Sequence, residues 1–169
     1  MKPAPEVVVA HSPGPEATRR LGAALASVVE AGDIVLLEGE MGAGKTVFAT
    51  GVGAGLGVPS PVTSPTFVLV RSQQGRSLTL HHADLWRLGS GDEIADLGLA
   101  ELAEDGGVAL VEWGERAREL VGGEYLGVVI EPEGPERRLV RFEARGPRWE
   151  RRMGALSAAI AQGAGGSQG

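Results

Sequence analysis

Apolar residues recur along the chain with two different periods, which together predict an alternation of strands and helices. Residues 6–10 and 33–37 are short runs rich in valine, isoleucine and leucine, as is typical of strands. Between these runs, apolar residues from 17 to 28 recur at helical spacing and predict a helix. After the second run, residues 46–56 predict another helix. The run 108–111 is apolar on both faces, which predicts a central strand covered on each side.

The predicted helix 46–56 contains three glycines, Gly51, Gly53 and Gly55. Glycine is a poor helix former, so intrinsic propensity does not explain this helix. We expect instead that the glycines allow the helix to pack closely against the sheet.

The rest of the chain predicts two hairpins, further helices and an irregular end. Alternating residues indicate strands paired as two hairpins at 66–71 with 77–84 and at 125–131 with 138–144. Helices are expected within 85–103, at 115–121 and at 148–160. Residues 162–169 are glycine-rich and lack an apolar anchor, so we expect them to be disordered and a single domain to span residues 1–161.

Composition is that of one globular domain. Of the 169 residues 43% are apolar, and none is cysteine, which excludes disulfides and thiolate metal sites. No apolar run approaches the roughly 18 residues that a membrane span needs, and the first residues lack a signal-peptide pattern. We therefore expect a cytoplasmic protein without a membrane partner.

Charge is distributed unevenly along the chain. The net charge of −6 argues against a protein that binds nucleic acid over its whole surface. Residues 1–136 carry 9 basic and 20 acidic side chains, whereas residues 137–169 carry 7 arginines and 2 glutamates. This basic edge is consistent with contact to a phosphate backbone or an acidic partner, and equally with a solvated strand and helix face.

One segment, between the predicted strand 33–37 and the predicted helix 46–56, carries a phosphate-binding pattern. It reads Gly39-Glu40-Met41-Gly42-Ala43-Gly44-Lys45-Thr46 and fits G-x-x-x-x-G-K-[ST]. In this context the backbone N–H groups and the helix N-terminus are aimed at one anion, and the glycines let the main chain close around it. We expect this phosphate loop, residues 39–46, to bind ATP or ADP.

Two side chains of the phosphate loop have specific roles in this interpretation. Lys45 can place a positive charge on the outer phosphates, and the Thr46 hydroxyl can bind Mg²⁺. Lys2 and Lys45 are the only lysines, while the other 14 basic residues are arginines. A compact ammonium suits a phosphate cradle better than a planar guanidinium does.

Hydrolysis also needs acidic groups beside the phosphates, because Mg²⁺ and the attacking water must be held in place. Glu112 directly follows the apolar run 108–111 and is the stronger candidate to hold Mg²⁺ or orient water. Asp84 ends the predicted strand 77–84 and is the second candidate. A helix cap or a surface ion pair is the alternative explanation for an acid at a strand end.

Other polar and aromatic residues lie beside these candidates. Thr66 opens a strand after a proline-rich loop, where it can sense the terminal phosphate or simply begin the strand. His82 lies on the same strand face as Asp84, so the two side chains can form a hydrogen bond, although a structural role is expected for this histidine. Trp86 and Trp113 each follow an acid closely, and either frame the site or pack in the core.

These motifs, taken together and in this order, resemble those of the TsaE family, also called YjeE. They are the phosphate loop, Ser64-Pro65-Thr66-Phe67, His82-x-Asp84-Leu85-Trp86-Arg87-Leu88, Leu97-Gly98-Leu99 and Val111-Glu112-Trp113. The resemblance covers roughly residues 12–120, and Trp86 stands where tyrosine is commoner in the family.

The resemblance implies an α/β, P-loop NTPase-like three-layer sandwich with a parallel core sheet and antiparallel edge strands. It implies weak ATPase activity and a role in tRNA threonylcarbamoyladenosine synthesis beside a TsaB–TsaD pair, which carries out the transfer to tRNA. By matching positions, Lys45 and Thr46 serve phosphate and Mg²⁺, Thr66 is a switch residue, and Asp84 and Glu112 are the essential acids.

Other nucleotide-binding classes are alternatives. A GTPase is not supported, since guanine selection in that class uses an Asn-Lys-x-Asp motif and the chain has no asparagine. A small-molecule or nucleoside kinase requires an acceptor pocket and an arginine-bearing lid. Residues 137–152 are a candidate for the lid, but the strand alternation there favours sheet. A nucleotide-sensing adaptor without hydrolysis is the third possibility.

Overall fold

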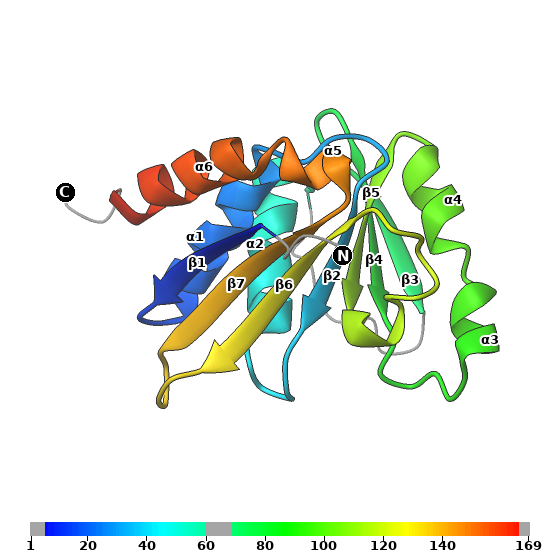
Figure 1. Ribbon diagram of the computed structural model, residues 1–169, viewed down its shortest axis with the longest axis horizontal. Helices are drawn as coiled ribbons and strands as arrows, with labels where there is room; N and C mark the ends of the chain where they lie inside the picture. The colour runs from blue at the N-terminus through cyan, green and yellow to red at the C-terminus, as the bar shows by residue number, and fades with distance from the viewer. Residues whose placement is uncertain (1–5, 60–68, 166–169) are drawn as a thin grey trace.

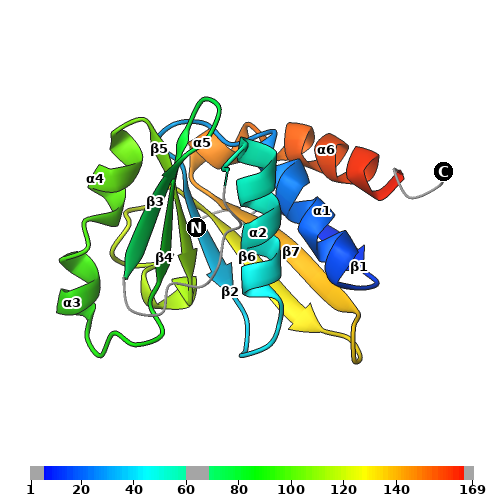
Figure 2. The same cartoon turned by 180° about the vertical axis from the view of Figure 1, so that it is seen from behind.

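Seven strands form one sheet in the computed structural model, which describes residues 6–59 and 69–165 (Figures 1 and 2). In chain order the elements are β1 (Val7–Ser12), α1 (Pro15–Ala26), β2 (Ile34–Glu38), α2 (Lys45–Leu56), β3 (Val70–Gln74), β4 (Thr79–Asp84), α3 (Gly91–Ala95), α4 (Leu99–Glu104), β5 (Gly107–Glu112), the 3₁₀ helix η1 (Gly114–Arg116), β6 (Tyr125–Pro132), β7 (Arg138–Arg145), α5 (Pro147–Glu150) and α6 (Met153–Gly165).

The sheet has the strand order β1-β7-β6-β2-β5-β4-β3. Strand β2 runs parallel to both neighbours, β5 and β6, and β4 runs parallel to β5. Both edges are antiparallel, because β3 pairs with β4 and β7 pairs with β6 and β1. The expected parallel core with antiparallel edge hairpins is therefore confirmed, and so is the central position of the apolar strand β5.

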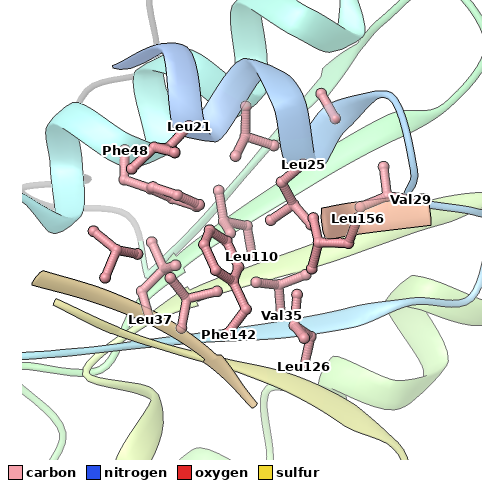
Figure 3. Packing of buried hydrophobic residues seen from close by; sticks show 14 of the residues in the cluster. Leu21, Leu25, Val29, Val35, Leu37, Phe48, Leu110, Leu126, Phe142 and Leu156 are labelled. Atoms are coloured by element: carbon pink, nitrogen blue, oxygen red, sulfur yellow. The ribbon is translucent and has the colours of Figure 1, made fainter. Parts of the chain in front are cut away.

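Helices cover both faces of the sheet and give three layers. On one face, α1, α2, α5 and α6 enclose an apolar core that contains Phe48, Leu110 and Phe142 (Figure 3). On the other face, α3, α4 and η1 cover a second cluster that includes Leu36 and Val111. Alternate residues of β2 and β5 thus enter different cores, which explains why both strands are apolar along their length.

Gly51 and Gly55 of α2 pack against α1, so the expectation that they pack against the sheet was wrong for these two. A Cβ added to Gly51 would lie under 3.0 Å from the carbonyl oxygen of Arg19, and one added to Gly55 would lie 2.5 Å from the Cβ of Ala26. Gly22 of α1 approaches the Phe48 carbonyl in the same way. The two helices can lie this close because each presents glycine to the backbone of the other.

Residues 85–103, predicted to hold one helix, form two short ones. Helix α3 ends at Ala95 and α4 begins at Leu99, and between them Gly98 adopts a left-handed conformation with φ +61°. A helix cannot continue through such a residue, so the chain turns here.

The two later helix predictions need correction as well. The stretch 115–121 was predicted as a short helix, but the helix that forms is the 3₁₀ helix η1 at Gly114–Arg116. There Gly114 packs so tightly on Leu36 that an added Cβ would lie under 3.0 Å away. The stretch 148–160 is divided between α5 and α6. Helix α6 continues to Gly165, so residues 162–165 are helical and not disordered as predicted.

The first hairpin has later bounds than predicted, because β3 and β4 pair between residues 70 and 84. Its predicted opening at 66–68, including the candidate Thr66, lies outside the described residues. The second hairpin, β6 with β7, matches its predicted bounds within one residue.

Candidate functional site

The phosphate loop connects the buried strand β2 to the N-terminus of α2. Gly42 and Gly44 have left-handed backbone conformations, with φ +81° and +111°, which side chains rarely adopt. Gly39 approaches β6 so closely that a Cβ would lie 2.6 Å from the carbonyl oxygen of Ile130. Glycine is thus required at three positions of the turn, and the turn directs the chain into the first turn of α2, whose N–H groups lack helical partners.

The carboxyl ends of β2, β4 and β5 meet beside this loop. The parallel register places Asp84 next to Glu112, and Glu112 next to Leu37 at the end of β2. A cavity of about 400 Å³ opens at this edge of the sheet. It is lined by Met41, Gly42, Gly44, Lys45, Thr46, Val47, Asp84, Trp86, Glu112 and Trp113.

Glu112 is a buried carboxylate with a hydrogen bond on each oxygen. The residue is only 3% exposed. The Thr46 hydroxyl donates to Oε1 over 2.9 Å, and Nε2 of His82 lies 2.6 Å from Oε2. The hydrogen bond considered between His82 and Asp84 is not the one that forms. His82 instead binds Glu112, and Asp84 Oδ1 accepts from the backbone N–H of Trp86 at 3.0 Å.

The Lys45 ammonium lies over the loop that it would serve. Its Nζ donates to the carbonyl oxygens of Gly39 at 2.6 Å and Glu40 at 2.9 Å, and it lies 4.0 Å from the centre of the Trp113 ring. Burial lowers the pKa of Lys45 from its usual value, while Glu112 and other nearby carboxylates oppose this shift. A bound phosphate would favour the charged amine further, because it brings negative charge into a partly dry site.

Two tryptophans form one wall of the cavity. The rings of Trp86 and Trp113 lie 4.6 Å apart, and Trp113, at φ +60°, is the only non-glycine residue with positive φ in the described part of the chain. Arg116 donates to the carbonyl oxygens of Leu85 and Leu88, which ties η1 to the segment after β4. The two tryptophans thus frame the site, and Trp113 contacts Lys45 directly.

Arg138 is a residue of this site that the sequence reasoning missed. From the start of β7 it donates to the carbonyl oxygens of Ala43 at 2.8 Å and Gly42 at 3.3 Å. A second cavity, of about 290 Å³, lies on this side of the loop, between the start of α1 and the β6–β7 turn. An arginine just after a Pro-Glu-Gly-Pro turn was the available signal, but nothing local places that turn beside the phosphate loop.

Fewer arginines of residues 137–169 are available to a partner than the charge count of the sequence indicates. Arg138 binds the phosphate loop, and Arg141 pairs with Glu131 at 3.0 Å. Arg148 and Arg152 pair with the buried Asp33 at 3.0 and 2.7 Å. At least four of the seven arginines therefore have partners within the fold.

Most predicted site residues lie around the first cavity, but not all use their side chains there. Met41, Gly42, Gly44, Lys45, Thr46, Asp84 and Glu112 line it. Glu40 contributes its carbonyl oxygen to Lys45, and the Ala43 side chain is fully buried. The position of Thr66 lies outside the described residues.

The donor set of the cavity fits Mg²⁺. No group of three histidine or acidic side chains suited to a metal occurs within residues 6–59 and 69–165. The Thr46 hydroxyl and the Glu112 and Asp84 carboxylates are oxygen donors at one edge, and Mg²⁺ typically takes one or two protein oxygens and completes its shell with phosphates and water.

In the described part of the chain, no helix combines the length and the hydropathy that a membrane span requires.

Comparison with known proteins agrees with this geometry. Residues 12–140 match the family model "Threonylcarbamoyl adenosine biosynthesis protein TsaE". The TsaE protein of Bacillus subtilis is 40% identical over 136 residues, which cover 80% of this chain and 85% of that protein. The Streptomyces coelicolor TsaE is 43% identical over 138 residues, covering 78% and 93% of the two chains.

A solved structure has the same fold. The crystal structure of Bacillus subtilis YdiB superposes with a TM-score of 0.77 at 32% identity, over 93% of this chain and 98% of that one. The family match spans the phosphate loop, both acid-ended strands and the second hairpin up to the start of β7. The chain thus belongs to the TsaE family of tRNA threonylcarbamoyladenosine biosynthesis proteins.

Proposed function

We propose that this protein is a Mg²⁺-dependent ATPase that supports the threonylcarbamoyladenosine modification of tRNA. The observation that carries the proposal is the meeting of Thr46, from the phosphate loop, with Glu112, from the neighbouring strand, in one cavity. Hydrolysis of a bound nucleotide requires a cation-binding hydroxyl and an acid at that relative position. Two acid-ended parallel strands beside a glycine-rich turn provide both.

Each side chain has a separate task in this proposal. Lys45 exchanges its two carbonyl partners for the outer phosphates of ATP, and the N–H groups of the first turn of α2 bind the same anion. Thr46 and Glu112 would hold Mg²⁺, which neutralises charge on the phosphates when it is bound. Asp84 supplies a second carboxylate to the waters at that edge, and Thr66 senses the terminal phosphate.

The modification chemistry itself takes place on partner proteins in this proposal. Relatives of this chain are named for tRNA threonylcarbamoyladenosine biosynthesis, and the cavity offers groups for a nucleotide. We infer that ATP turnover drives a conformational step in the TsaB–TsaD pair, so that activity is weak without it. Contact with tRNA is indirect or involves the exposed part of the arginine-rich segment 137–169.

The fold does not favour the kinase alternative, because the segment considered as its lid contains a paired strand. Residues 137–152 were the candidate for an arginine-bearing lid, but residues 138–145 of this segment form β7, which is paired with β6 on one side and β1 on the other. A strand held on both sides cannot close over a transferred phosphate as a lid does.

The test is the substitution Glu112→Gln. We expect the affinity for ATP to stay within about threefold, while the rate of phosphate release falls by about 100-fold or more, because a neutral amide neither balances cation charge nor orients water as well. Calorimetry and a phosphate-release assay measure the two quantities, with and without TsaB–TsaD and tRNA. Phosphate release without any added acceptor also separates an ATPase from a kinase.

Glu115→Gln is the matched control, because Glu115 is an exposed acid near Lys45 that does not line the cavity. Its phosphate-release rate should equal that of the wild type. If Glu112→Gln hydrolyses ATP as fast as this control, Glu112 has no catalytic role and the proposal fails.

A further inference from the structure

Two adjacent histidines on β4 point to opposite faces of the sheet and have different partners. His81 lies 2.7 Å from the Ser72 hydroxyl of the neighbouring edge strand. His82 lies on the face of α2, where its Nε2 is 2.6 Å from Oε2 of Glu112. The first contact joins β3 to β4, whereas the second reaches the cavity at the carboxyl edge of the sheet.

The contact between His82 and Glu112 is buried and short. His82 is 2% exposed and Glu112 3% exposed, so water does not compete for either group. A hydrogen bond to an ionised acceptor is stronger and shorter than a neutral one, typically about 2.7–2.9 Å for a nitrogen donor. The 2.6 Å between Nε2 and Oε2 is shorter still. Because the carboxylate can only accept, Nε2 must carry the proton and donate.

His82 is not explained by packing alone. Within residues 6–59 and 69–165, its Nδ1 is buried and has no hydrogen-bond partner. An unpaired buried polar atom costs about 1–3 kcal/mol, so an apolar residue of similar shape would serve the core at least as well. The polar contact of this imidazole is the one aimed at Glu112.

The two bonds on Glu112 differ in whether they compete with a cation. Thr46 holds Oε1 at 2.9 Å, but its hydroxyl is also the group proposed to bind Mg²⁺. His82 holds the other oxygen, Oε2, and is not among the residues that line the cavity. Its bond can therefore persist while the Thr46 hydroxyl changes partners.

We propose that His82 is a positioning residue for Glu112, which fixes the plane of the carboxylate so that Oε1 stays directed at Thr46 and the cation. This inference rests on the proposed function, since it concerns the same site. A group that orients a ligand from behind contributes about 10–100-fold to metal affinity or activity. His82 is thus expected to affect the Mg²⁺ requirement and the rate, but not nucleotide affinity measured without Mg²⁺.

The first experiment compares His82→Phe, His82→Gln and His81→Phe. We expect His82→Phe to lower kcat by about tenfold or more and to raise the Mg²⁺ concentration for half-maximal nucleotide binding by a similar factor. Gln can place its amide nitrogen near the position of Nε2, so His82→Gln should recover most of both losses. His81→Phe changes the adjacent buried ring on the other face and should stay within about twofold of the wild type.

The outcomes separate this inference from the proposed function. A wild type that hydrolyses ATP together with a His82→Phe variant of equal kcat and Mg²⁺ requirement would overturn the positioning role and leave the function intact. Equal losses in His81→Phe, or no recovery in His82→Gln, would also overturn it. If the wild type does not hydrolyse ATP, the Mg²⁺ dependence of nucleotide binding still decides the role of His82.

A second measurement needs no activity. Nitrogen-15 NMR of the histidine side chains should show His82 with its proton on Nε2, in slow exchange with water, and Glu112→Ala should shift or remove that signal. The His81 signal should stay unchanged in the same variant. A His82 signal that does not respond to Glu112→Ala contradicts the contact on which the role depends.

Discussion

Arg138 holds the phosphate loop from a position 95 residues further along the chain than Ala43. Its guanidinium also donates to the carbonyl oxygens of Gly134 at 3.2 Å and Arg137 at 2.9 Å, so it joins the β6–β7 turn to the loop. All these acceptors are backbone carbonyls. The shape of the loop thus depends on a side chain outside the phosphate-binding pattern.

We expect Arg138→Ala to weaken nucleotide binding by about 5- to 30-fold, because two hydrogen bonds that preform the loop, worth roughly 1 kcal/mol each, are lost. The melting temperature should change by no more than a few degrees, since the contacts lie at a partly exposed turn. Calorimetric titration with ADP measures the affinity. Arg137→Ala removes the neighbouring exposed arginine and should bind ADP like the wild type; equal affinities in both variants would contradict the role of Arg138.

At the scale of elements, the packing of α1 on α2 depends on glycines that face the other helix. Gly51 has no room for a Cβ, because the Arg19 carbonyl occupies that space. Helix propensity alone predicts that alanine would improve α2 by about 1 kcal/mol. The steric cost of the added Cβ outweighs this gain. To accommodate it, α1 and α2 would have to move apart, which would disturb the core in which Phe48 packs (Figure 3).

We therefore expect Gly51→Ala to destabilise the fold by about 1–3 kcal/mol, as overpacking does in a well-packed core. Gly154→Ala is the matched control, since Gly154 is an exposed residue of α6 with nothing within 4 Å of an added Cβ. That change should be neutral or stabilise the fold by up to about 1 kcal/mol. Urea unfolding measures both, and a more stable Gly51→Ala variant would show that the helices are not held this close.

Local pattern was sufficient for the strands and for the phosphate loop, but not for contacts between them. Period two correctly places His82 and Asp84 on one face, yet these residues are about 6–7 Å apart along a strand. The partner of His82 is set by the register of β4 against β5, which puts Glu112 beside Asp84. Register, the partner of Gly51 and the reach of Arg138 arise from tertiary packing, which no local period encodes.

The helices predicted over 17–28 and 46–56 form, as α1 and α2, but the predictions within 85–103 and at 115–121 failed for a related reason. Gly98 ends a helix because its backbone is left-handed, and Gly114 prevents a regular helix because it packs on Leu36. A glycine in a sequence indicates flexibility in either case. Which conformation it takes is decided by the surrounding core.

At the scale of the whole molecule, Asp33 joins the start of β2 to the C-terminal helices. This residue is 1% exposed, and its carboxylate pairs with Arg148 of α5 and with Arg152 between α5 and α6. Arg152 also donates to the Val28 carbonyl at 3.0 Å and lies over the Trp149 ring. These ion pairs thus hold α5 and the start of α6 against the start of β2, the strand that leads into the phosphate loop.

We expect Asp33→Ala to destabilise the fold by about 3–5 kcal/mol, because two guanidinium groups lose their buried counter-charge. Thermal and urea unfolding measure this loss. Glu131→Gln breaks the pair with Arg141 on the surface and should change stability by less than about 1 kcal/mol, since exposed ion pairs contribute little. Similar losses of unfolding free energy in the two variants would mean that the buried ion pairs of Asp33 contribute no more to stability than an exposed pair does.

The pairing of β1 with β7 has a consequence for protein synthesis. Among the described strands, the first in chain order, β1, lies at a sheet edge beside the last, β7. While the ribosome adds the intervening residues, the nascent valine-rich segment has no sheet neighbour to bind and is exposed to misassociation. The phosphate loop should likewise gain its Arg138 contact only after β7 has left the exit tunnel.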